Sequence, residues 1–595
     1  MRPTKRLLAL GLASVMLAAC SHKDKDAPLA FVPADTPYVF ANLDILDDDT
    51  RNALIAQADA QLPGQVVQMK STADDLTAKG SVEAGRLLHA FAAEFDGKSA
   101  ETFAKNAGLD MKGHSAIYGI GLSPVVRFEL ADTAAFEGFV GRLETAYGQK
   151  LETATIGSQS YRHVTPKDSG VQVILAVVGK QAVAALLPAD APQPLLRQAL
   201  GLDRPDKNIQ DDGRLETLAK AKGYKPYAVG QVDLVRMLPL IATGKDPLFA
   251  AVLKHKLEAD AAETGAPVPA ASELPASCQT DAARIASRVP SMSFGYTRLD
   301  AKHQEQRFDI ALAQDIGKAF SGLKVEAPGL GQDGDAPFDL SLALPVEQIR
   351  TFWTAQAEAV AAKPFECPML ADLNETFGKI GPAMQQAAIP PFGDIRGIRI
   401  ALDSLKVPAA GAASPIPAFT GRVLLATRNP TGLVAMGQAF MGGANLKLTA
   451  DGKPVQLPEN LTAMVGQPGW AAMNDKAVVI GIGAGEDAKL GDMLKAPTGD
   501  TGRMARGFIN GDMYRSWVAL MADKAESMAD ATAAAAAVDG DTDPAAAEKA
   551  RANAAAHAKA QFDAMRAQAE RIVSASGEAH VEDDGLVITG KNEVK

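Results

Sequence analysis

Residues 125–147 read VVRFELADTAAFEGFVGRLETAY and carry two different hydrophobic periods. Apolar and polar side chains alternate over 126–130, which is typical of a half-buried β-strand. Asp132 then precedes an apolar stripe at helical spacing, and an aspartate in that position caps the first turn of a helix. The stripe consists of Phe136, Phe139, Val140, Leu143 and Tyr147. The segment therefore predicts a strand followed directly by an amphipathic helix.

The second half of the chain repeats this order. Residues 422–427 read RVLLAT and favour a strand, after which Asn429 and Pro430 cap and start a helix. Antiparallel strands follow in both halves, with hairpin turns predicted at 178–181 and 473–476. Further matched segments are an early strand at 37–44 and 338–344, a strand and helix at 227–240 and 508–521, and a closing hairpin at 294–312 and 579–589.

We therefore predict an α+β fold of two tandem homologous halves, 29–327 and 338–595, each built of antiparallel strand meanders packed with helices. A coincidental order of common elements is the alternative to duplication. Residues 328–337 are acidic and glycine-rich and should form a flexible linker. The Ala-rich segment 523–560 predicts two exposed helices in a low-complexity surface insertion. The tryptophans should anchor the cores; they are Trp353, Trp470 and Trp517.

Length and charge narrow the class of protein. The chain has 595 residues, which is too many for one hydrophobic core and predicts two or more domains. Its formal net charge is -11, which argues against a nucleic-acid partner because such partners select a basic face. The same charge argues against broad adhesion to anionic lipid headgroups.

The start of the chain is an export signal. Residues 1–6 hold three positive charges, and residues 7–19 are apolar or small, a run too short to span a bilayer. The run ends in Leu17-Ala18-Ala19-Cys20, which resembles the lipobox of bacterial lipoproteins. The resemblance implies that a diacylglyceryl group is transferred to the Cys20 sulfur, that residues 1–19 are removed, and that the new amine is acylated. Several acyl chains on one residue give stable attachment to a lipid bilayer.

The residue after the lipobox bears on location. In enteric bacteria an aspartate there tends to hold lipoproteins in the inner membrane, whereas this chain has Ser21. The pattern therefore resembles that of lipoproteins on the periplasmic face of the outer membrane. Residues 20–28 would form a short lipidated tether.

Two further cysteines, Cys278 and Cys367, remain in the exported chain. The compartment is oxidising, so we predict one disulfide between them, closing a loop of roughly 90 residues worth about 4–5 kcal/mol in the chain-entropy model. Two buried thiols are the alternative. A zinc site is disfavoured because neither cysteine has a second Cys or His at ligand spacing.

Three familiar site patterns are incomplete in this sequence. Residues 481–487, GIGAGED, resemble a dinucleotide fingerprint, but Glu486 stands where the third glycine belongs and would repel a pyrophosphate. Ser115 lacks the glycine that completes a nucleophile elbow. The acidic run 539–543 lacks the turn glycine and the bidentate glutamate of a calcium loop. We therefore expect no catalytic residue, no bound cofactor and no metal site.

Residues 31–39, FVPADTPYV, resemble the opening of an uncharacterised family of secreted or membrane-attached bacterial proteins that begin with Pro-x-Asp-Thr. The resemblance implies strand–helix–meander units and carries no activity. Our hypothesis is a non-enzymatic, membrane-tethered envelope protein that binds a partner protein or an apolar or glycan ligand. The alternatives are an envelope hydrolase with a sequence-scattered active site and a periplasmic assembly or chaperone factor. Carboxylates, His and Ser converging in a pocket would favour the hydrolase, and a smooth apolar groove would favour lipid or peptide binding.

Overall fold

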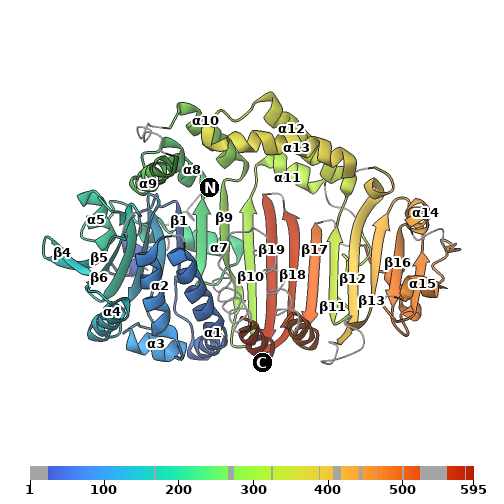
Figure 1. Ribbon diagram of the computed structural model, residues 1–595, viewed down its shortest axis with the longest axis horizontal. Coiled ribbons are helices and arrows are strands. Elements are labelled where there is room, and N and C mark those ends of the chain that lie inside the picture. Colours follow the sequence, from blue (N-terminus) through green and yellow to red (C-terminus); the bar gives the residue numbers. More distant parts are fainter. Residues whose placement is uncertain are drawn as a thin grey trace, which may run out of the picture.

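The computed structural model describes residues 24–595 apart from 79, 167–168, 265–273, 323–325, 388, 407–416, 441–445, 464, 499–501, 523–558, 560 and 583. Within these residues, helices and one antiparallel sheet of 19 strands make up the fold (Figure 1), so the α+β prediction is confirmed. The predicted Ala-rich insertion, 523–560, lies outside the described residues apart from residue 559.

The strands of the first half are β1 (Tyr38–Ala41), β2 (Ser115–Ile120), β3 (Ser123–Glu129), β4 (Glu152–Ile156), β5 (Gln159–Val164), β6 (Val171–Val178), β7 (Gln181–Pro188), β8 (Val229–Asp233), β9 (Ser291–Leu299) and β10 (His303–Ala311). Those of the second half are β11 (Phe338–Ala343), β12 (Ile395–Lys406), β13 (Ala418–Thr427), β14 (Val455–Gln456), β15 (Gly469–Met473), β16 (Ala477–Ile482), β17 (Arg503–Asn510), β18 (Ile572–Glu582) and β19 (Gly585–Val594).

The helices of the first half are α1 (Asp48–Ala78), α2 (Val82–Phe95), α3 (Ala100–Asn106), α4 (Thr133–Tyr147), α5 (Gln193–Leu200), α6 (Ile209–Asp212), α7 (Arg214–Lys222), α8 (Leu234–Thr243), α9 (Pro247–Thr264), α10 (Ala276–Arg288) and α11 (Gln314–Ser321). Those of the second half are α12 (Val346–Ala362), α13 (Ala371–Ala387), α14 (Pro430–Phe440), α15 (Glu459–Thr462) and α16 (Asp487–Lys495). Residues 511–522 and 561–569 are helical as well.

The two halves of the chain pair their strands in the same order, except that the first half has one more strand, β4, at its outer end. Across the first half the order is β4-β5-β6-β7-β3-β2-β1-β8-β9-β10. Across the second half it is β14-β15-β16-β13-β12-β11-β17-β18-β19. The last strand of each half meets the other, because β10 and β19 pair antiparallel from His303 opposite Glu593 to Ala311 opposite Gly585. The halves therefore share one continuous sheet.

The strand and helix predicted from residues 125–147 are β3 and α4. Asp132 caps α4, and its carboxylate accepts hydrogen bonds from the backbone N–H groups of Ala134 and Ala135 at 2.8 and 3.1 Å. The helix ends at Gly148, whose φ of 84° suits a residue without a side chain. All five residues of the predicted stripe are buried. Local periodicity and capping were therefore sufficient to place this unit.

Two of the hydrophobic cores lie on one face of the sheet, and a third, in which α2 and α4 pack on Phe128, Leu175 and Ala182, covers the other face at β3, β6 and β7. In the first half, helices α5 to α7 pack on Val39, Val183 and Ile174, and in the second half α16 packs on Leu424 and Val479. Cross-strand pairing through β8, β9, β10, β19, β18 and β17 places both cores on the same side. We call this side the core face and the opposite side the open face.

The segment expected as a flexible linker, 328–337, instead packs against the second core. Leu330 and Ala336 are only 1% and 2% exposed. Gly329 has a φ of +93° and lies so close to Arg399 that an added Cβ would sit 2.5 Å from the Arg399 Cδ. Composition marked the segment as loop-like, but it could not reveal that glycine there permits close packing on a buried arginine.

Candidate ligand-binding surface

The predicted disulfide is present and connects the two halves. Cys278 on α10 and Cys367 before α13 are bonded, with their Cα atoms 4.4 Å apart. The Asp281 carboxylate accepts hydrogen bonds from the backbone N–H groups of Glu366 and Cys367 at 2.7 and 2.9 Å. Both cysteines are buried among apolar side chains. The other predicted site residue, the lipid acceptor Cys20, lies outside the described residues.

A cluster of polar residues on the core face tests the hydrolase alternative. It lines a cavity of about 220 Å³ beside the β10–β19 pairing. The Tyr224 hydroxyl lies 3.0 Å from the Ser293 hydroxyl and donates to the Asp309 carboxylate at 2.6 Å. Asp309 also forms ion pairs with Lys222 at 3.0 Å and Arg307 at 2.7 Å. Carboxylates and a serine therefore do converge here.

The protonation states in this cluster do not favour catalysis. Burial, followed by the hydrogen bond to Asp309, raises the pKa of Tyr224, so the phenol beside Ser293 stays protonated. Burial alone would lower the pKa of Lys222, but hydrogen bonds to Asp309 and Asp584 outweigh it and raise the value. Neither of these two groups can act as a general base for Ser293 near neutral pH, and the ionised Asp309 carboxylate opposite Ser293 is already bound by Tyr224, Lys222 and Arg307. The arrangement is that of a balanced ionic network.

The three incomplete site patterns noted in the sequence are considered next. Glu486, at the third position of the dinucleotide-like motif, is fully buried and pairs with Arg422 at 3.0 Å and Lys489 at 3.1 Å. Ser115 lies on β2, where its hydroxyl bonds to Asn42 at 3.1 Å. The acidic run 539–543 lies outside the described residues. Among the residues that the structure covers, no group of His, Cys, Asp and Glu side chains is arranged to hold a metal ion.

The open face of the sheet is apolar across both halves. One row of directly paired residues crosses eleven strands without a charged or polar side chain. It runs Ile117, Phe40, Gly230, Phe294, Phe308, Ile588, Ala579, Ala505, Leu342, Ile398 and Leu425. The next row runs Gly590, Gly577, Gly507, Leu340, Ile400, Val423 and Ile480. The first row continues across the pairing of the two halves, whereas the second begins at Gly590, whose partner on β10 is the polar Gln306.

Large apolar side chains in these rows are in contact with solvent. Ile117, Ile588 and Ile480 are 44%, 43% and 45% exposed, and Phe40 and Val423 are 38% and 39% exposed. Ionic side chains on the opposite face are buried instead, as in Arg399 at 1%. Exposed large apolar side chains on one face are typical of interaction surfaces when they form a contiguous patch.

Helices cover part of the open face in the first half and lie along the strand ends elsewhere. Figure 1 looks onto this face, with α1 and α2 in front of the strands and α7 behind them. Helices α10, α11, α12 and α13 lie along the upper margin in that view. The predicted core anchors Trp353, on α12, and Trp517, on helix 511–522, are 38% and 41% exposed. The third, Trp470, packs on the second core. Burial of Trp353 and Trp517 was over-predicted because their helices lie at the margin of the sheet.

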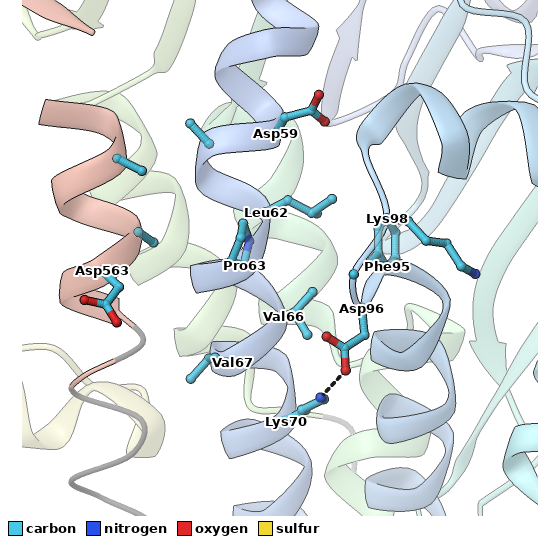
Figure 2. Close-up of a pocket in the computed structure, with 14 residues that line it drawn as sticks. Asp59, Leu62, Pro63, Val66, Val67, Lys70, Phe95, Asp96, Lys98 and Asp563 are labelled. Atoms are coloured by element: carbon cyan, nitrogen blue, oxygen red, sulfur yellow. Dashed lines mark hydrogen bonds and ion pairs between the residues drawn. The ribbon is translucent and has the colours of Figure 1, made fainter. Parts of the chain in front are cut away.

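A separate cavity lies between α1, the end of α2 and helix 561–569 (Figure 2). Its volume is about 540 Å³, and its apolar lining includes Leu62, Pro63, Val66 and Phe95. The ion pair Lys70–Asp96, at 2.6 Å, crosses one side of it. The cavity joins elements of the first and second halves.

Among the described residues, no helix combines the length and apolar character needed to cross a bilayer. Comparison with known proteins gives no further guide: no family model, no curated protein and no solved structure matches this chain.

Proposed function

We propose that this protein is a lipid-anchored, non-enzymatic envelope protein that binds an apolar ligand on the open face of its sheet. The observation that carries the proposal is the pair of apolar rows with five large side chains exposed to solvent. Leaving such surface in water is unfavourable by roughly 25 cal/mol per Å², so a ligand that covers it gains affinity. A hydrolase is less well supported, because the carboxylate opposite Ser293, that of Asp309, is already bound by Tyr224, Lys222 and Arg307.

The anchor would be the acylated Cys20, on the periplasmic face of the outer membrane. The chain is fixed to the folded protein soon after that residue. Gln210 donates to the Asp24 carbonyl at 3.1 Å, and Arg204 pairs with the Asp26 carboxylate at 2.6 Å. Three residues separate Cys20 from Asp24, and four residue steps span at most about 14 Å. The folded protein would therefore stand directly at the bilayer surface.

We also propose that the two halves are homologous and arose by duplication. Support comes from the shared pairing order, in which each half runs from a paired meander through a central strand, β1 or β11, to a closing hairpin. Each closing hairpin is preceded by a helix, α10 or 561–569. Duplication would explain how one apolar face extends over both halves.

The test measures binding of a neutral fluorescent probe, N-phenyl-1-naphthylamine. The chain from residue 21, exported behind an ordinary cleavable signal peptide, keeps every described residue. Covering the exposed 43% of Ile588 is worth about 1 kcal/mol, or about fivefold in affinity. Because a buried glutamate adds a further cost, Ile588→Glu combined with Ile480→Glu should weaken binding at least tenfold. The matched control is Val82→Glu on α2, a residue 48% exposed that belongs to neither apolar row. Equal binding by all three proteins would overturn the proposal.

A further inference from the structure

The first described segment, residues 24–32, packs on the core face. The Gln181 side chain donates to the Asp26 carbonyl at 2.5 Å, and Arg127 donates to the same Gln181 side chain at 3.0 Å. The residues paired with Arg127 on β2 and β7 belong to the first core. The Arg127 guanidinium also lies over the Phe31 ring, 4.0 Å from the ring centroid. The chain therefore enters the folded protein on the side of the sheet opposite to the apolar rows.

The spacer before this segment is short. Four residue steps separate Cys20 from Asp24, and they span at most about 14 Å. At the folded end of the spacer, Gln210 donates to the Asp24 carbonyl at 3.1 Å, and Arg204 pairs with the Asp26 carboxylate at 2.6 Å. A bilayer that holds the acylated Cys20 must therefore come within about 14 Å of Asp24.

Two layers of the protein separate this segment from the opposite side of the first half. The sheet is the first layer, and helices α2 and α4 form the second, because they pack on Phe128, Leu175 and Ala182. A sheet with its side chains is about 10 Å thick, and a helix adds about 10 Å. The two layers together are about 20 Å thick, which is more than the spacer can cross. A bilayer that holds Cys20 therefore cannot lie against the open face of the first half.

We infer that the anchored protein turns its core face, at residues 24–32 and Lys207, toward the bilayer and the open face of its first half toward the aqueous compartment. The inference rests on the proposed function, because it requires the acylated Cys20. Lys207 belongs to this surface because its side chain is exposed and its backbone carbonyl accepts a hydrogen bond from the Ala34 N–H at 2.9 Å. In this half, the surface proposed to bind an apolar ligand is then reached from the aqueous side and does not contact the membrane.

The experiment measures how close each side of the first half lies to lipid headgroups. The acylated protein is purified from membranes and reconstituted into phosphatidylcholine vesicles that carry a nitroxide quencher on the headgroup. Lys207→Cys places a fluorescent label between Arg204 and Gln210, beside the spacer, and Ile117→Cys places it on the open face, where that residue is 44% exposed. Quenching at residue 207 should be at least threefold stronger than quenching at residue 117, because the label at residue 117 faces the aqueous compartment.

A second label on the open face is the matched control. Phe40 pairs with Ile117 on the neighbouring strand and is 38% exposed, so the label on Phe40→Cys should be quenched as weakly as the label on Ile117→Cys. Thermal unfolding verifies that each labelled variant is folded, and Asp206→Cys replaces Lys207→Cys if the latter does not fold.

The outcomes separate this inference from the proposed function. Quenching at residue 117 equal to or stronger than that at residue 207 would overturn the orientation while the anchor stands. Failure of the acylated protein to bind the vesicles would overturn the anchor and the orientation together. The naphthylamine assay uses the chain from residue 21 in solution, so it tests apolar binding on the open face independently of both.

Discussion

Replacing Asp339 by asparagine should destabilise the second half strongly. Asp339 is fully buried, and its carboxylate binds Arg399 at 2.6 Å and Arg506 at 3.1 Å. Both guanidinium groups are themselves nearly inaccessible to water, with side-chain exposures of 2% and 3%. Among the ion pairs of the described residues, the substitution leaves these two buried positive charges with Asp335, which contacts Arg399. Breaking a buried ion pair in this way costs about 3–5 kcal/mol.

Asp335 supplies the matched control within the same cluster. Its carboxylate also contacts Arg399, at 2.7 Å, but its side chain is 57% exposed. Water screens that pair, so Asp335→Asn should cost about 0–1 kcal/mol. For a unit the size of the second half, each kcal/mol shifts the melting temperature by about 2–4 °C, so Asp339→Asn should melt about 6–20 °C lower. Circular dichroism of the purified chain measures this, and a shift below 2 °C would refute the reasoning.

Lowering the pH should reproduce part of the loss of stability that Asp339→Asn causes. Burial alone would raise the pKa of Asp339, but hydrogen bonds and charge from Arg399 and Arg506 outweigh it and hold the pKa below its usual range. A carboxyl group with a depressed pKa stabilises the folded state above its unfolded value, about 3.9, and loses that contribution as pH falls toward the folded value. The unmodified chain should therefore lose stability below about pH 4 more steeply than Asp339→Asn does.

Three further outcomes are expected. Cys20→Ala should abolish incorporation of radiolabelled palmitate, and a labelled mutant protein would contradict the lipobox interpretation. The mature chain should weigh two hydrogen atoms less under non-reducing conditions than after reduction. Reducing the Cys278–Cys367 disulfide, whose cysteines are 89 residues apart, should lower the free energy of unfolding by about 4–5 kcal/mol. Free thiols in the native protein would contradict the disulfide. Burial, aided by the charge of Asp246, raises the pKa of Tyr38 to about 12, so the absorbance difference between the unmodified chain and Tyr38→Phe should titrate there, and a midpoint near 10 would contradict this environment.

Local sequence patterns predicted which helices and strands form better than they predicted which face of each strand is buried. The alternation over 126–130 and the cap at Asp132 predicted β3 and α4, and the expectation of an oxidising compartment predicted the disulfide. Alternation in a strand, however, only separates two faces and does not say which one is covered. Apolar side chains are usually the buried ones and charged side chains the exposed ones. In β12 and β16 this is reversed, because Arg399 is buried and Ile480 is exposed.

That inversion depends on partners far away in sequence. Arg399 is satisfied by Asp339, 60 residues earlier, and Arg422 by Glu486, 64 residues later. A single sequence gives no sign of these pairings, so it could not reveal that the charged face is the covered one. The surface proposed to bind a ligand therefore lies on strands whose existence was predictable but whose exposed face was not.

Helices α10 and 561–569, which precede the two closing hairpins, are each attached to the other half of the chain. The two attachments differ in stiffness. Helix α10 is joined to the second half by a covalent bond, so that junction resists separation for as long as the chain stays oxidised. Helix 561–569 meets α1 through side-chain contacts around the 540 Å³ cavity, with Gly64 lying close to Ala564. The second junction is thus the compliant one, and strain applied to the sheet would be released there first.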